Sequence, residues 1–136
     1  MRHVIAALVI PAALVATPMA ANAYATMTAR TITLTATDNG RHVRVHRGDT
    51  VQVLLRADPR ANPDPTTWWR AIDESGPALR ALPQTAISIR GTTRGRYRAA
   101  ARGEATLSSS RPVCPRHGTG PTCHSMQGWN VTVDVR

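Results

Sequence analysis

Short segments in which apolar residues alternate with polar ones recur along most of the chain. Residues 31–35 alternate threonine with isoleucine and leucine, and residues 50–55 show the same alternation with valine and leucine. The clearest alternation runs from Trp129 to Val135. A period of two residues is typical of a β-strand with one buried face. Shorter segments of the same kind predict further strands at residues 42–46, 68–72, 86–89, 96–99 and 105–108.

Glycine, proline and asparagine mark turns between these segments. Asp38-Asn39-Gly40 and Gly48-Asp49 are typical turn sequences, and residues 57–67 hold three prolines without any periodicity. Short strands, frequent turns and the lack of a helical period predict an all-β fold, namely an antiparallel β-sandwich of about seven to eight strands. A small closed barrel is the alternative architecture. Irregular loops are also expected at residues 73–83, 91–95 and 111–128.

The first residues have the pattern of a secretory signal peptide. A basic start at Met1-Arg2-His3 precedes an apolar run over residues 4–16, and the small residues Ala21 and Ala23 form a cleavage site. The apolar run is too short to span a bilayer, and a buried N-terminal helix is the alternative interpretation. We therefore expect a signal peptide over residues 1–23, a single secreted, extracellular domain over residues 24–136, and no membrane span.

The composition is strongly basic. The 136 residues include 17 basic ones, all arginine, against eight acidic ones, which gives a net charge of +9. A hydrophobic content of 42% suffices for a packed core even though phenylalanine is absent. The charge favours acidic partners such as anionic wall polymers. Nucleic acid is not an expected partner, because no base-reading motif accompanies the charge and the signal peptide indicates export.

Two rows of basic side chains lie on predicted strands. Alternate residues of a strand point to the same side, so each row shares one face of its strand. If both strands belong to one sheet, one outer face of the sandwich is markedly basic; the alternative is a solvated face without a partner. The first row consists of Arg94, Arg96 and Arg98, and the second of His42, Arg44 and His46.

Cys114 and Cys123 are the only cysteines of the chain. Two neighbouring cysteines in an exported domain predict a disulfide bond. It would close a ring of about ten residues, which the chain-entropy model values at about 2.7 kcal/mol. His117 and His124 lie in and beside this loop, so a zinc or copper site is the alternative. Because oxidation would remove both thiolate ligands, no metal is expected.

Sequence motifs of common enzyme classes are absent. The chain has no phosphate-binding loop, dinucleotide fingerprint, nucleophile elbow or zinc-protease helix motif. Its acidic residues are scattered, and no histidine has an obvious serine or cysteine partner by spacing. We therefore expect neither an enzyme nor a bound cofactor.

Several features resemble one known family. Asn62-Pro63, Thr66-Thr67 and Trp69 resemble the Asn-Pro-Thr-Thr-Gly-aromatic-x-Trp segment of the chagasin-like inhibitors of papain-family cysteine proteases. Residues 91–95 fall where that family has a glycine-rich loop, and Arg111-Pro112 falls where it has Arg-Pro-Trp. The resemblance covers nearly all of the expected domain. The chain also resembles small exported actinobacterial proteins with a cysteine-clamped loop.

The chain departs from the family pattern at three places. Asp64-Pro65 is inserted into the first motif, Trp68 replaces its glycine, and Val113 replaces the tryptophan after Arg-Pro. Glycine reaches backbone conformations that other residues rarely adopt, and tryptophan is a frequent anchor of protein interfaces. The fold that the resemblance implies depends less on these positions than the activity does.

The resemblance implies an immunoglobulin-like β-sandwich with three loops at one end. In the family these loops enter the protease cleft as a wedge and block it reversibly, by steric occlusion. The chain would act as a monomer, with a papain-family cysteine protease as its partner. A non-inhibitory cell-surface or wall-associated module that binds through the basic face is the alternative function. The partner-binding residues carried over by position are Thr66, Thr67, Trp68, Gly91, Gly95, Arg111 and Pro112.

Overall fold

The computed structural model describes residues 28–58, 60, 64–83, 87–114, 123 and 125–136. The expected signal peptide, residues 1–23, lies outside the described residues, so the signal peptide stays a prediction. His117 and His124 also lie outside the described residues. In the part of the chain that is described, no helix is both long enough and apolar enough to cross a membrane.

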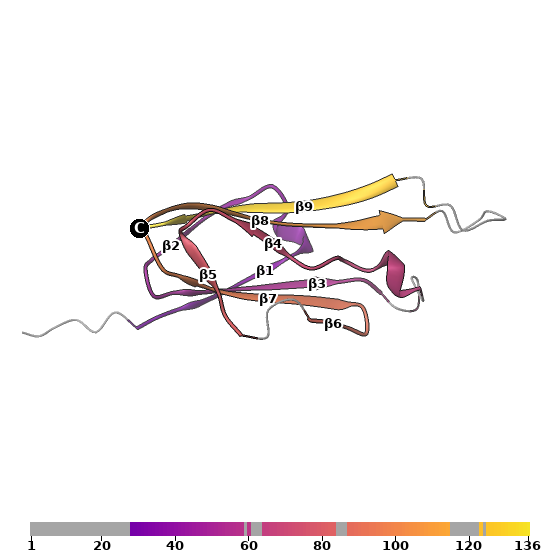
Figure 1. Cartoon of the computed structure of the whole chain (residues 1–136), viewed down its shortest axis with the longest axis horizontal. Coiled ribbons are helices and arrows are strands. Elements are labelled where there is room, and N and C mark those ends of the chain that lie inside the picture. The colour runs from indigo at the N-terminus through magenta and orange to yellow at the C-terminus, as the bar shows by residue number, and fades with distance from the viewer. Residues whose placement is uncertain (1–27, 59, 61–63, 84–86, 115–122, 124) are drawn as a thin grey trace, which may run out of the picture.

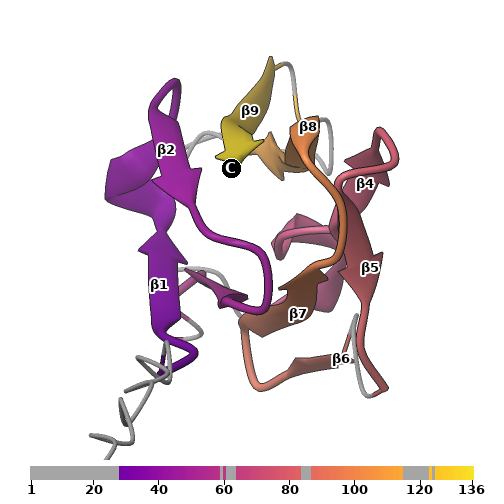
Figure 2. The same cartoon turned by 90° about the vertical axis from the view of Figure 1, so that its left-hand side faces the viewer.

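Nine strands in the described residues form two layers that pack face to face (Figures 1 and 2). The all-β sandwich expected from the sequence is therefore confirmed. One layer, the β3–β7 sheet, contains β1 (Thr31–Thr35), β3 (Thr50–Arg56), β5 (Leu79–Ala81), β6 (Ile87–Ile89) and β7 (Thr92–Ala99). The other layer, the β8–β9 sheet, contains β2 (His42–Val45), β4 (Asp73–Ser75), β8 (Gly103–Val113) and β9 (Ser125–Val135).

Each sheet has one parallel pair at its edge, although a purely antiparallel sandwich was expected. β1 pairs in parallel with β3, and β2 pairs in parallel with β9, whereas the other pairs are antiparallel. The cause is the turn at Asn39-Gly40, which follows the 3-10 helix η1 (Ala36–Asp38) and does not close a hairpin. It carries the chain from one sheet to the other, and the next turn brings it back. β1 and β3 therefore run in the same direction.

The turn after η1 also covers an edge of β9. The Asn39 side chain accepts a hydrogen bond from Asn130 N at 2.8 Å and donates one to Gly128 O at 3.3 Å. Gly40 N donates to Asn130 O at 2.7 Å. The amide side chain thus takes the place of a neighbouring strand, which leaves fewer free backbone groups on this edge.

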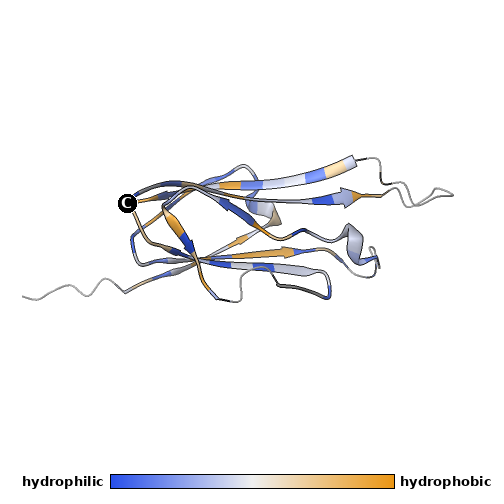
Figure 3. Ribbon diagram, viewed as in Figure 1, coloured by the Kyte–Doolittle hydropathy of each residue, from blue (hydrophilic) through white to orange (hydrophobic). Residues whose placement is uncertain are grey.

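The core consists of the residues of each strand that point between the sheets. In β3, and in β9 from Trp129 on, every second residue is buried, as the alternation predicts. Figure 3 shows the hydropathy of the residues along the strands, with apolar residues in orange. Each valine or leucine buried there contributes about 1.5–3 kcal/mol. Trp129 keeps its polar atom satisfied, because Nε1 donates to Thr35 O at 2.9 Å. The largest core side chains are Trp129, Tyr97, Leu55 and Leu107, packed among Val45, Val51, Val53, Val131, Val133 and Val135.

The strand expected at residues 68–72 is not present. Trp69 and Ile72 are both buried, a spacing of three residues that a strand with one buried face does not produce. The segment pairs with neither sheet as a strand and instead lies between them. The Trp69 carbonyl accepts a hydrogen bond from Thr93 Oγ1 at 2.7 Å, on β7. Arg70 N donates to Ser110 O at 2.9 Å, on β8, and its carbonyl accepts from Ser109 Oγ at 2.8 Å. The regular strand, β4, begins only at Asp73.

Three predicted loops contain strands. β4 and β5 form within residues 73–83, and β7 already starts at Thr92, so the expected 91–95 loop is reduced to a turn. The loop predicted for residues 111–128 is shorter as well, because β8 continues to Val113 and β9 begins at Ser125. In that part most side chains are exposed on both faces, so no hydrophobic period marks the strands.

The two basic rows do not share a face. Arg94, Arg96 and Arg98 point outward from β7, but β2, which carries His42 and Arg44, belongs to the opposite sheet. The condition for one face formed by both rows, that their strands belong to one sheet, is therefore not met, because the chain changes sheet between β1 and β2.

Gly95 provides a first test of the packing. A Cβ at this buried position would lie 2.8 Å from Ile72 Cδ1 and 2.9 Å from Tyr97 Cε2, whereas one at Gly128 would meet no atom within 4 Å. We expect Gly95→Ala to lower the free energy of unfolding by about 1–3 kcal/mol because the core is overpacked. The matched Gly128→Ala control should change it by less than about 1 kcal/mol. Urea unfolding measures both, and equal effects would contradict the packing described.

Asp49 fixes the turn between β2 and β3. Its buried carboxylate accepts hydrogen bonds from Arg30 N at 2.9 Å and from His46 N at 2.8 Å. These backbone donors, of which Arg30 N has the largest effect, hold the pKa of Asp49 below its ordinary value of 3.8. The ionised form is thus stabilised by folding, and this contribution is present above the ordinary pKa and lost as the pH falls through the lowered one.

We expect Asp49→Asn to lower the free energy of unfolding at about pH 7, because one backbone N–H then faces an amide instead of a carboxylate. The difference from the wild type should be smaller at about pH 3, because below the ordinary pKa of 3.8 the wild type begins to lose its own carboxylate contribution. Urea unfolding at both pH values measures this, with Glu104→Gln at an exposed position of β8 as the control. A difference that stays constant between the two pH values would refute the role of the carboxylate.

Candidate protein-binding end

Three segments that are distant in sequence meet at one end of the sandwich, which we call the loop end (Figure 1). They are the connection after β3, which includes the 3-10 helix η2 (Pro65–Thr67), the turn between β6 and β7, and the tips of β8 and β9. Ala57 N donates to Gly91 O at 2.7 Å and so joins the first two segments. η2 packs beside β8, the first strand of the third segment.

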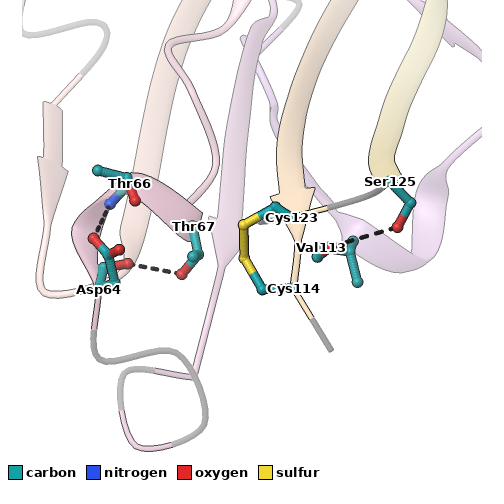
Figure 4. The surroundings of a disulfide bond; sticks show 7 residues. All are labelled: Asp64, Thr66, Thr67, Val113, Cys114, Cys123 and Ser125. Carbon is teal, nitrogen blue, oxygen red and sulfur yellow. Dashed lines mark hydrogen bonds between the residues drawn. A yellow bond between two sulfur atoms is a disulfide. The ribbon is translucent and has the colours of Figure 1, made fainter. Parts of the chain in front are cut away.

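The first segment is organised by Asp64. Its carboxylate accepts a hydrogen bond from Thr66 N at 2.9 Å, and its carbonyl accepts one from Thr67 Oγ1 at 2.7 Å (Figure 4). The bond from Thr66 is the main cause that lowers the pKa of Asp64. Pro65 occupies the first position of η2, where its missing N–H is tolerated. The Asp64-Pro65 insertion thus builds a capped turn that exposes Thr66 and buries Thr67.

Trp68, at the position where the resembled inhibitors have glycine, shows no backbone strain. Its φ of −79° and ψ of 165° are those of extended backbone, which any residue adopts. The Trp68 side chain is half-buried, while the neighbouring Trp69 is only 3% exposed. One indole therefore anchors the segment in the core and the other stays near the surface.

The second segment is a two-residue hairpin turn. Ile89 pairs with Thr92, and the residues between them, Arg90 and Gly91, have φ values of 49° and 77°. Positive φ at both central positions is the mark of a type I′ turn, which matches the twist of a β-hairpin. Arg90 is exposed at the turn and Gly91 is buried. Gly95 is not brought to this end, since it pairs with Val53 in the interior of β7.

The third segment is a two-stranded arm formed by residues 109–114 and 125–129. Half-buried Arg111 stacks over the Trp69 ring, with its guanidinium carbon 5.1 Å from the ring centre. Its Nε donates to Gln127 Oε1 at 2.7 Å, across the strand pair. A cation over an indole contributes about 0.5–2 kcal/mol, depending on how far it is desolvated. Arg111 therefore fastens the arm to the first segment.

The arm exposes two apolar side chains that sequence reasoning missed. Among the described residues, Val113 at 40% and Met126 at 54% are the large hydrophobic residues that remain exposed. By strand alternation Val113 lies on the inner face of the arm, with Arg111, and Met126 on the outer face, with Pro112. The sequence marked Val113 only as a departure from the Arg-Pro-Trp pattern of the chagasin-like inhibitors. No sequence signal indicated that Met126 is exposed.

The predicted disulfide joins Cys114 to Cys123, with their Cα atoms 4.2 Å apart (Figure 4). It follows directly on the last strand pair of the arm, Val113 with Ser125. Both thiolates are thereby consumed, which argues against the alternative metal site with His117 and His124. Among the described residues, no group of three or more histidine, cysteine or acidic side chains is placed to hold a metal ion.

Comparison with known proteins gives a fold relationship. No protein-family model matches the sequence, and no curated protein matches it. The chain is similar to the crystal structure of the cysteine protease inhibitor EhICP2 from Entamoeba histolytica, with a TM-score of 0.52, 14% identity, and coverage of 79% of this chain and 96% of that one. The solution structure of amebosin aligns with a TM-score of 0.45, 14% identity, and coverage of 80% and 99%, a likeness too weak to carry an argument.

The likeness to EhICP2 establishes the fold. The chain is a β-sandwich of the kind found in a cysteine protease inhibitor, as its resemblance to the chagasin-like inhibitors implied.

The disulfide should stabilise the arm without determining the fold. We expect the double variant Cys114→Ser, Cys123→Ser to lose about 2.7 kcal/mol of unfolding free energy, because the open chain gains loop entropy. β8 and β9 pair over their whole length up to these residues, so the far-ultraviolet circular dichroism spectrum should not change. Guanidine unfolding of both proteins measures the loss. An unfolded double variant would show instead that the sandwich depends on the cross-link.

Proposed function

We propose that this protein is an exported, reversible inhibitor of papain-family cysteine proteases that fills the active-site cleft with its loop end. The observation that carries this proposal is the meeting of three segments at one end of a sandwich whose fold EhICP2, a cysteine protease inhibitor, shares. A disulfide in a small domain is compatible with the proposed export. Inhibition by occlusion requires only a rigid, complementary surface and no reacting group.

The contacts proposed for the partner follow from exposure. Thr66, Trp68 and Pro112 reach the surface of the loop end and are proposed to touch the protease, together with the turn at Gly91. Thr67 and Arg111 face inward and are proposed to hold these contacts in place. The remaining predicted residue, Gly95, is assigned to packing of the core.

Val113 and Met126 supply the apolar contacts that the missing tryptophan would have made. They lie on opposite faces of the arm, so an arm inserted into a cleft meets one wall with each. Burial of an apolar side chain of this size is worth about 1.5–3 kcal/mol. The hydrogen bonds around Asp64 and the stacking of Arg111 keep the loop end in one shape, which limits the entropy lost on binding.

Titration of papain with the purified, oxidised protein tests the proposal. We expect competitive, reversible inhibition, with the inhibitor uncut on a denaturing gel after the assay. Thr66→Arg and Val113→Asp should each weaken inhibition by about tenfold or more, because each places a charge in the contact. Thr31→Arg, an exposed threonine at the opposite end of the sandwich, is the matched control and should change nothing.

Two results would contradict the proposal. One is the absence of inhibition of papain and its relatives at high micromolar concentration of the folded protein. The other is inhibition that Thr66→Arg, Val113→Asp and Thr31→Arg affect equally, since the loop end would then not be the binding surface.

A further inference from the structure

The outer face of the β3–β7 sheet is rich in arginine. The strands of this sheet contain five arginines and no acidic residue, whereas those of the β8–β9 sheet contain four acidic residues. All five arginines are exposed. Charge is thus divided between the two layers of the sandwich. The arginines are Arg56 on β3, Arg80 on β5 and Arg94, Arg96 and Arg98 on β7.

Two of these arginines lie directly opposite each other. Arg80 and Arg98 are partners in the antiparallel pair of β5 and β7. Like charges at directly opposed positions destabilise a sheet. The ion pairs found among the described residues involve Arg41, Arg44, His46 and Arg136, and so relieve neither Arg80 nor Arg98. An anion placed between the two guanidinium groups would remove this repulsion.

The pair opens onto a basic cleft at the end of the sandwich opposite the loop end. The cleft measures about 680 Å³. Backbone hydrogen bonds from Gly48 N to Ala99 O at 2.9 Å and from Arg47 N to Arg136 O at 3.1 Å hold its walls. Asp134 compensates one of the charges, through Arg136 at 3.0 Å. The charged and titratable side chains that line the cleft are His46, Arg47, Arg80, Arg98, Arg102 and Arg136.

We propose that this arginine face and cleft bind a linear polymer that carries phosphate groups. Alternate residues of a strand lie about 6.6–7 Å apart, so Arg94, Arg96 and Arg98 form a straight row of about 13 Å that leads to Arg80 and the cleft. A row of cations matches a chain of repeated anions better than it matches a single small ion. Arginine also holds phosphate oxygens in a bidentate manner.

The cleft is separate from the loop end, although Arg56 and Arg94, at the other end of the arginine face, lie near the β6–β7 turn. The cleft is lined by Arg136, which follows the last residue of β9, whereas the first residues of β9 belong to the loop end; Figure 1 shows these two ends of β9 at opposite ends of the sandwich. A polymer held at Arg80, Arg98 and the cleft therefore leaves the loop end accessible. It would keep the protein at an anionic surface while the loop end binds its own partner. Failure of polymer binding would therefore leave protease inhibition intact, and failure of inhibition would leave polymer binding intact.

Binding of long-chain inorganic polyphosphate to the purified, oxidised full chain tests the proposal, with orthophosphate as the single-anion comparison. We expect polyphosphate to bind, to raise the melting temperature, and to lose at least about tenfold in affinity between about 0.05 M and about 0.5 M salt. Orthophosphate should bind far more weakly.

A charge-matched pair of variants locates the site. The double variant Arg80→Gln, Arg98→Gln should bind polyphosphate at least about fivefold more weakly, while Arg41→Gln, Arg44→Gln, with the same loss of charge outside the β3–β7 sheet, should lose less than about twofold. Without polymer, the first variant should be at least as stable to heat as the wild type, because the opposed charges are gone. Inhibition of papain should be the same in all three proteins.

Several outcomes would overturn the proposal. Equal losses in the two variants would show that only net charge matters. Orthophosphate binding as tight as that of polyphosphate would indicate a site for a single anion. Tighter binding to phosphatidylserine vesicles than to polyphosphate would identify a lipid surface as the partner instead.

Discussion

The segment from Trp69 to Ile72 fastens the two sheets to each other at the loop end. The carbonyls of Trp69 and Ile72 accept hydrogen bonds from side chains of β7, and the backbone of Arg70 exchanges two hydrogen bonds with β8. The side chains of Trp69 and Ile72 fill the space between the layers. Hydrogen bonds in a buried, low-dielectric place are strong, so separating the two layers here would cost much free energy. Because Arg111 stacks on Trp69, the same segment also sets the position of the arm.

The sequence predicted best those strands that have one face buried in the core and one face exposed. In β3, and in β9 from Trp129 on, the alternation of valine with polar residues follows directly from burial, so these strands could be recognised. The segment at Trp69 is also rich in apolar residues, but its hydrogen bonds are shared between two layers, and hydropathy does not report which partner a carbonyl has. The sequence predicts the turn at Asn39 but not that this turn carries the chain from one sheet to the other. The crossing depends on the hydrogen bond between Asn39 and Asn130 on β9, two residues that are 91 positions apart in the chain.

The candidate site could be predicted only in part. The disulfide followed from residue type and spacing, and the grouping of three loops at one end followed from a resemblance to known inhibitors. Burial of Gly95 and exposure of Met126 could not be predicted, because both depend on how far the strands extend. β7 begins before Gly95, which places that residue inside the sheet. The arm extends beyond the core, and Met126 on it is exposed among the described residues.

The position of the disulfide determines what a single cut between the two cysteines can do. Cys114 and Cys123 are joined to each other, and β8 and β9 are paired from Val113 and Ser125 onward. If one peptide bond between the cysteines is hydrolysed, the two pieces of chain remain joined through sulfur, and no fragment leaves. A nicked molecule would thus keep its two sheets, and a single cut between the cysteines would not by itself destroy the fold.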